Sequence, residues 1–148
     1  MRRIAFALLA VAVCGCETET TGLEAVDLAG EWVATKYELT DRTTVQVTLD
    51  LVARDGASFV ARIDESGSVT LTFQDGRGGG STDTGTLRSW VTGSGRDEQA
   101  HAEITAGGQR YLVGVDGDAL VLVDSDRAFV IGGGTEVPAT LRIELLRR

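Results

Sequence analysis

The stretch SVTLTFQD at residues 68–75 decides the fold class. Val69, Leu71 and Phe73 alternate in it with serine, threonine and glutamine, so every second side chain is apolar. Successive side chains of a β-strand point to opposite faces, and a period of two therefore predicts a strand with one buried face. This stretch indicates a β-protein whose sheet covers an apolar core.

The same alternation continues on both sides of this stretch. In residues 58–64 phenylalanine, alanine and isoleucine occupy every second position, and residues 65–67 supply a turn before the next strand. These two strands predict a β-hairpin. Residues 110–115 and 119–124 predict a second hairpin, because the Asp-Gly pair within residues 116–118 readily adopts the positive φ angles of a tight turn.

The short connections predict that neighbouring strands pair antiparallel along the chain. Residues 97–106 also contain helix formers, but their hairpin neighbours favour a strand. Residues 43–54 are interpreted as an extended connection or an additional strand. A meander without a long crossover can close on itself and remove its exposed edges, which predicts an all-β, eight-stranded up-and-down antiparallel β-barrel. The predicted strands are residues 32–39, 58–64, 68–75, 84–92, 99–105, 110–115, 119–124 and 140–146.

The composition indicates one ordinary globular domain. The chain has 148 residues, a hydrophobic fraction of 43% and a formal net charge of -8. The chain is too short for two well-filled cores and too apolar to be disordered. Its acidic balance argues against a nucleic-acid partner, since phosphate binding needs clustered Lys and Arg. A monomer is expected.

The N-terminus predicts export. Arg2 and Arg3 precede the apolar run at residues 4–13. This run is shorter than the roughly 20 residues that span a bilayer, but it suits the hydrophobic region of a secretory signal.

The sequence Val13-Cys14-Gly15-Cys16 resembles the lipobox of bacterial lipoproteins. The resemblance implies that residues 1–15 are a signal peptide and that Cys16 is lipidated, with palmitate among its acyl chains. Residues 16–27 would then be a flexible tether, and residues 28–148 the barrel domain. Glu17 follows the cysteine in place of the Asp that marks inner-membrane retention, which favours the outer membrane, facing the periplasm or the cell surface. The alternatives are a signal without lipidation, or a strained Cys14–Cys16 disulfide.

Gly30-Glu31-Trp32, at the start of the first predicted strand, resembles the Gly-x-Trp signature of lipocalins. The hairpin spacing and the ending PATLRIELLRR at residues 138–148 are similar to those of small lipocalin-like lipoproteins of bacterial envelopes. The resemblance implies a barrel with one closed end, where a late arginine stacks over Trp32. Arg142 is the candidate because it lies on the last strand, which should pair with the first. Alternatively, Arg142 lies on the polar face of that strand and points into solvent.

A barrel of eight strands either fills its interior with side chains or holds one small ligand. The aromatic fraction is only 5%, and Ala100, Ala102, Gly114 and Ala119 are small, which favours a cavity. The chain is therefore predicted to be a membrane-anchored lipocalin-like lipoprotein that binds or carries a small hydrophobic ligand. The alternative is a non-enzymatic interaction module of the envelope with a packed barrel.

Two charged residues follow Trp32 on the first strand. If Trp32 points inward, strict alternation also turns Lys36 and Glu38 inward, where they would hold the polar group of a ligand. Unpaired buried charges are costly, which favours a bulge or the opposite phase, with both charges in water. The side chains that face the interior are then Val33, Tyr37 and Leu39.

The sequence offers little for catalysis or metal binding. His101 is the single histidine, alternation turns it outward, and nothing places Ser89 or Ser94 beside it as a triad would need. We expect no enzymatic activity, cofactor or metal. Four aspartates near two turns would be the candidate calcium ligands, although turn chemistry also explains the first two of them: Asp116, Asp118, Asp124 and Asp126.

Overall fold

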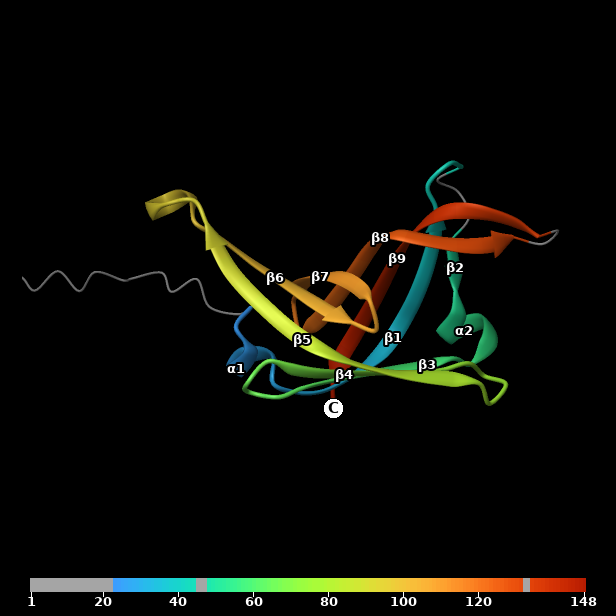
Figure 1. The fold of residues 1–148 in the computed structure, drawn as a ribbon, viewed down its shortest axis with the longest axis horizontal. Helices are drawn as coiled ribbons and strands as arrows, with labels where there is room; N and C mark the ends of the chain where they lie inside the picture. The colour runs from blue at the N-terminus through green and yellow to red at the C-terminus, as the bar shows by residue number, and fades with distance from the viewer. Residues whose placement is uncertain (1–22, 45–47, 132–133) are drawn as a thin grey trace, which may run out of the picture.

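The computed structural model describes residues 23–44, 48–131 and 134–148. Eight antiparallel strands form a closed barrel, because β1 pairs with β3 on one side and with the last strand, β9, on the other (Figure 1). The predicted fold class, an all-β eight-stranded up-and-down barrel, is confirmed. The strands of the ring are β1 Gly30–Asp41, β3 Ser58–Ile63, β4 Ser68–Gln74, β5 Gly80–Thr92, β6 Gln99–Ala106, β7 Gln109–Asp116, β8 Ala119–Ile131 and β9 Thr135–Arg147.

Two small elements lie outside this ring, between β1 and β3. Strand β2 (Thr48–Asp50) pairs with the C-terminal half of β1, and helix α2 (Leu51–Asp55) follows directly. The Asp50 carboxylate caps the helix by accepting hydrogen bonds from the backbone N–H groups of Val52 and Ala53. This region, predicted as a connection or an extra strand, therefore contains a short strand and a helical turn that needs its aspartate cap.

Two hairpins continue beyond the barrel wall. The β5–β6 hairpin extends to one side, where a short 3₁₀ turn, η1 (Gly95–Asp97), connects its strands, and the β8–β9 hairpin extends to the other side (Figure 1). Strands β8 and β9 are longer than predicted because they remain paired up to Ile131 and Thr135.

The apolar core fills one half of the barrel. Its side chains occupy alternate positions of the strands, so the period of two seen in the sequence corresponds to the inner face. Helix α1 (Ala25–Leu28) covers this half, although residues 25–27 were predicted to belong to the flexible tether. The fully buried side chains include Ala61, Ile104, Leu120, Leu122, Leu141, Ile143 and Leu145.

Candidate functional site

Trp32 closes the filled end of the barrel. Its indole Nε1 donates a hydrogen bond to the carbonyl oxygen of Leu28 in helix α1, 2.8 Å away. The Arg147 guanidinium carbon lies 4.7 Å from the centroid of the Trp32 ring system, and Arg147 donates a hydrogen bond to the carbonyl of Asp27. A cation–π contact of this kind contributes about 0.5 to 2 kcal/mol. This end therefore holds a structural plug that joins β1, β9 and α1.

The arginine over Trp32 is Arg147, and the choice of Arg142 was wrong. The register of β1 and β9 places Arg147 directly across from Trp32, whereas Arg142 lies across from Glu38. Arg142 points outward, 41% exposed, with its Nε 3.1 Å from Oε1 of Glu144. Alternation explains the error, since Arg142 follows the fully buried Leu141 and must face away from the core.

A bulge in β1 decides which of its side chains face the interior. The register with β9 shifts between Ala34 and Lys36, which leaves Thr35 as the extra residue. Beyond the bulge Tyr37 packs against the core, while Lys36 is exposed, with its Nζ 3.3 Å from Oε2 of Glu144. Strict alternation, which would turn Lys36 and Glu38 inward, therefore does not hold, because one inserted residue reverses the phase of the strand.

The alternative prediction for the first strand, a bulge with Val33, Tyr37 and Leu39 facing the interior, holds for two of these three residues. Tyr37 and Leu39 pack against the core as that reading expects, and Glu38 lies on the same face as its outward partner Arg142. Val33 precedes the bulge and follows the inward Trp32, so it lies on the outer face across from the exposed Leu146. Its expected inward position was wrong.

The other half of the barrel contains a cavity of about 350 Å³ at the open end, which we call the cup. Tyr37 lies at the centre of an aromatic group on its wall, with ring centroids 5.8 Å from Phe59 and 5.4 Å from Phe73. Tyr111 contributes a fourth ring from β7. The cup is lined by Tyr37, Phe59, Leu71, Phe73, Ser81, Asp83, Gly107, Gln109, Tyr111 and Arg127.

A second bulge brings a charged pair to the wall of the cup. Between Asp124 and Arg127 strand β8 has one residue more than its partner β9, so both side chains face inward. Asp124 is only 4% exposed and accepts a hydrogen bond from Nε of Arg127 at 2.8 Å. Arg127 also donates from Nη2 to the Tyr111 hydroxyl at 2.7 Å. The buried carboxylate is thus paired, as its burial requires.

Asp83 lies on the opposite wall of the cup. It is half-buried on the inner face of β5, across from Leu71 of β4. A Cβ atom added at Gly107 would lie 2.5 Å from Cγ and Oδ1 of Asp83, so the carboxylate rests directly against the β6–β7 turn. Within the described residues Asp83 makes no ion pair or hydrogen bond.

Burial in the cup raises the pKa of both tyrosines. Desolvation raises the pKa of Tyr37 from 10.0 to about 12, and desolvation also raises the pKa of Tyr111, although the positive charge of Arg127 opposes both shifts. The Tyr37 hydroxyl has no hydrogen-bond partner in the described part of the chain that would favour its ionised form.

We expect neither tyrosine of the folded protein to ionise at its ordinary pKa. Because the folded-state pKa is raised, the protonated hydroxyls stabilise the fold fully below pH 10, and this contribution is lost as the pH rises towards about 12. An ultraviolet difference titration of tyrosinate should show a midpoint above 10, and the protein unfolded in guanidinium should titrate near 10. A native midpoint at the unfolded value would contradict the burial of the two tyrosine hydroxyls in the wall of the cup.

The small residues that favoured a cavity do not form the cup. Ala102 belongs to the filled core, and Gly114 has no atom within 4 Å of a Cβ position. Ala100 lines a separate hollow of about 90 Å³ beside Trp90 and His101. The cup is instead lined by four aromatic rings together with polar and charged side chains.

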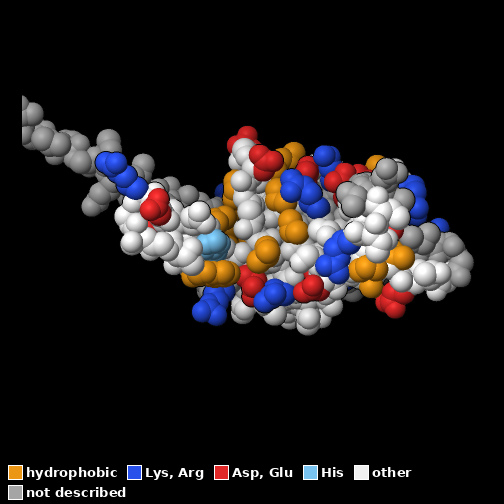
Figure 2. Space-filling view, turned by 90° about the horizontal axis from the view of Figure 1, so that it is seen from above, with side chains coloured by type: hydrophobic (Ala, Val, Ile, Leu, Met, Phe, Trp, Pro, Cys, Tyr) orange, Lys and Arg blue, Asp and Glu red, His pale blue; other side chains and the backbone are white. Residues whose placement is uncertain are grey.

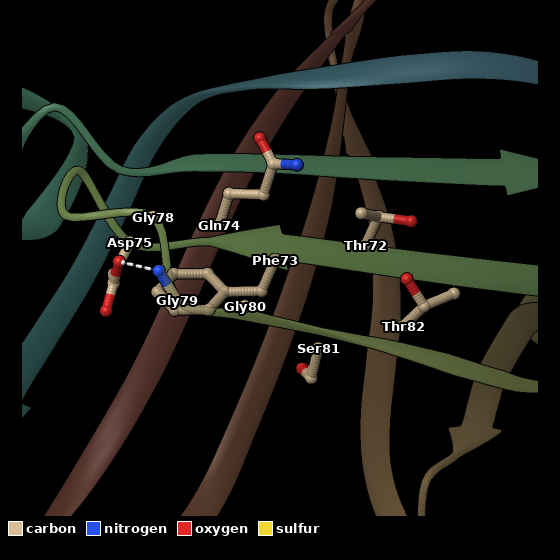
Figure 3. Close-up of a pocket in the computed structure, with 9 residues that line it drawn as sticks. All are labelled: Thr72, Phe73, Gln74, Asp75, Gly78, Gly79, Gly80, Ser81 and Thr82. Carbon is tan, nitrogen blue, oxygen red and sulfur yellow. Dashed lines mark hydrogen bonds between the residues drawn. The ribbon is translucent and has the colours of Figure 1, made fainter.

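A second hollow, of about 370 Å³, runs along the β4–β5 hairpin (Figure 3). Figure 3 shows Thr72 and Gln74 on one side of the hairpin and Phe73 and Ser81 on the other. Its Asp75 carboxylate accepts hydrogen bonds from the backbone N–H groups of Arg77 and Gly79, so it stabilises the turn. Because its lining comes from this one hairpin, the hollow brings fewer different side chains together than the cup does.

Apolar side chains are also exposed on the outside of the barrel. On the face seen in Figure 2, hydrophobic side chains lie among Lys, Arg, Asp and Glu. Leu112, Val121 and Val123 line an outer hollow of about 380 Å³, to which Arg142 contributes. Isolated exposed apolar residues are common on soluble proteins and define no site by themselves.

The remaining candidates stay apart from the cup. His101 stacks on Trp90, with centroids 5.5 Å apart, and its Nε2 lies 2.7 Å from Oγ1 of Thr92. Within the described ranges, no three His, Cys, Asp or Glu side chains come together in a way that could hold a metal ion. Among the helices of the described part, none combines the length and the hydrophobicity of a membrane-spanning segment. Cys14 and Cys16 lie outside the described residues.

The fold and the cup thus define a closed antiparallel barrel with one plugged end and one hollow end. Comparisons with known protein families, with curated proteins and with solved structures gave no significant match. The geometry of the cup therefore carries the functional argument.

Sequence reasoning missed Asp83, Tyr111 and Arg127. Two of these positions had a usable signal, since continuing the alternation backward from Leu87 gives Asp83, and Tyr111 stands two residues before the inward Val113. Arg127 had none, because its inward orientation depends on the β8 bulge.

Proposed function

We propose that this domain binds a small, mainly apolar molecule non-covalently in the cup. The observation that carries the proposal is a solvent-connected cavity of about 350 Å³ with four aromatic side chains on its wall. Small-molecule sites are typically concave, mostly apolar cavities of roughly 300 to 1,000 Å³ with a few fixed polar groups. The cup has such polar groups in Asp83, Arg127 and the hydroxyl of Tyr37.

The energetics favour a ligand with a flat or chain-like apolar part. Burial of apolar surface contributes roughly 25 cal/mol per Å², and aromatic walls add large contact areas. The filled half of the barrel supports the cup from below, because its side chains are fully buried and already ordered. Binding would therefore require little rearrangement of the wall.

A neutral fluorescent probe tests this proposal. We expect N-phenyl-1-naphthylamine to become fluorescent on binding, and Phe73→Ala to weaken binding about 10-fold because the ring forms part of the wall. Thr72→Ala is the control, since Thr72 is the adjacent residue on the opposite face of β4. Equal affinities of the two variants, or the absence of a fluorescence increase, would instead favour the interaction module with a packed barrel.

We also propose that the protein is an exported lipoprotein anchored through Cys16. The lipobox resemblance and the apolar run at residues 4–13 support this. The chain enters the barrel through α1 at the plugged end, so a short N-terminal anchor would attach that end to the membrane. The cup at the other end would then face away from the bilayer and remain open to ligand.

Replacing the cysteine tests the anchor. In a bacterial host that processes lipoproteins, the wild-type protein should fractionate with membranes and incorporate labelled palmitate. We expect Cys16→Ser to abolish both, and Cys14→Ser, the matched control, to change neither. Membrane association that persists in Cys16→Ser would contradict the proposal.

A further inference from the structure

We propose that the cup selects an organic cation, an amine or a quaternary ammonium with an apolar substituent, over an anion of the same size. This inference rests on the proposed function, because it names the chemical class of the ligand. It starts from the charges that face the cup. Asp83 and Arg127 line the cup, and Arg127 pairs with the buried carboxylate of Asp124 behind the wall.

The guanidinium is already neutralised. Arg127 donates from Nε to the buried Asp124 and from Nη2 to the hydroxyl of Tyr111, which uses two of its donor groups inside the wall. A bound anion would have to compete with Asp124 for this arginine and would stay close to both carboxylates. Arg127 therefore gives the cup little affinity for anions.

Asp83 supplies the unpaired charge. Its carboxylate is half-buried, lies against the turn at Gly107, and has no cationic partner in the described residues. A partly desolvated carboxylate that lacks a counter-ion attracts a cationic group more strongly than an exposed one does. The acidic chain, with a formal net charge of -8, adds a long-range attraction of the same sign.

The aromatic walls complete the site. Tyr37, Phe59 and Phe73 form one continuous aromatic group, and Phe73 is across from Ser81, two residues from Asp83 on the same face of β5. The faces of aromatic rings attract ammonium groups, especially methylated ones, through their quadrupole. A carboxylate beside several rings therefore suits an ammonium group and the alkyl or aryl carbons attached to it.

Three matched probes test the selectivity. Heptyltrimethylammonium and octanoate carry the same seven-carbon alkyl chain with a positive and a negative head, and 1-octanol is the neutral comparison; each is titrated calorimetrically below any concentration at which it aggregates. We expect the cation to bind about 10-fold more tightly than octanoate, with octanol in between. Asp83→Asn should reduce this preference at least 5-fold. Asp118→Asn, which removes an exposed carboxylate from the β7–β8 turn, should preserve it.

The outcomes separate this inference from the proposed function. If octanoate binds as tightly as the cation, or if Asp83→Asn keeps the full preference, the charge inference is wrong, and binding of octanol still supports an apolar ligand. If no probe binds to the wild-type protein, both proposals fail. If Asp83→Asn loses octanol as well, its cup is damaged, and the cation-to-octanoate affinity ratio of the wild-type protein decides.

Discussion

Gly85→Ala is expected to destabilise the barrel by about 3 kcal/mol. Gly85 lies in β5 between Val69 of β4 and Ala106 of β6. A Cβ atom at this position would overlap the carbonyl oxygen of Thr105 and lie 2.7 Å from Cα and Cβ of Ala106. Two of these three atoms belong to the backbone of the neighbouring strand, so the strands must separate to admit a methyl group.

The matched control is Gly114, a glycine in the interior of β7. A Cβ there meets no atom within 4 Å, and its φ is not positive, so we expect Gly114→Ala to change the free energy of unfolding by less than about 0.5 kcal/mol. Urea unfolding followed by tryptophan fluorescence measures both variants. Equal midpoints would show that β5 and β6 do not approach as closely as the structure has them.

The strands on either side of Gly85 were predicted well from the sequence. Alternation in residues 68–75 gave β4 with the correct inward face, Val69, Leu71 and Phe73. Each of these residues lies across from an inner-face residue of β5, and the pair at Val69 is Gly85. A half-buried strand leaves its period of two in the sequence because only one face contacts the core. All eight ring strands were therefore predictable, including the contact between first and last.

Alternation alone did not predict the phase of a strand beyond a bulge, although the cost of burying Lys36 and Glu38 favoured the observed phase in β1. A bulge adds one residue without a composition signal, and it reverses every side chain that follows. In β1 the bulge makes Tyr37 face the interior in place of Lys36, and in β8 it places Arg127 on the inner face next to Asp124. The bulge in β1 turns a cation outward, whereas the bulge in β8 turns a cation inward, where it pairs with the buried carboxylate of Asp124. Which charged side chains face the cup depends on where their ion-pair partners lie, and the local alternation of apolar residues carries no information about those partners.

The plug at the filled end also depends on a feature that alternation in the sequence did not predict. The Gly-x-Trp resemblance predicted an arginine over Trp32, and such an arginine is present. Two of the last strand's arginines, Arg142 and Arg147, lie five residues apart and therefore on opposite faces. The bulge at Thr35 and the helix at residues 25–28 select Arg147, because only this residue reaches both the indole and the carbonyl of Asp27.

Leu145→Ala is expected to cost about 3 to 4 kcal/mol, and Leu146→Ala less than about 1 kcal/mol. The two residues are the same type and adjacent on β9, but Leu145 is fully buried and Leu146 is 47% exposed. Leu145 lies across from Leu120 of β8 and Ala34 of β1, at the point where the last strand meets the first. Truncating it removes apolar contacts and leaves a cavity that packed strands cannot fill.

This pair of variants tests the closure of the barrel directly. In an open sheet β9 would be an edge strand that contacts only β8, and truncation of Leu145 would remove fewer buried contacts. Because β9 pairs with both β8 and β1, the same truncation weakens two strand contacts and the support beneath Trp32. Urea unfolding of both variants gives the difference between their free energies of unfolding. The tryptophan fluorescence of the folded variants reports on the surroundings of Trp32 in the plug. Comparable costs for the two leucines would mean that the inward face of β9 is not the one assigned, and the cup, whose wall includes the adjoining part of β1, would lose its structural basis.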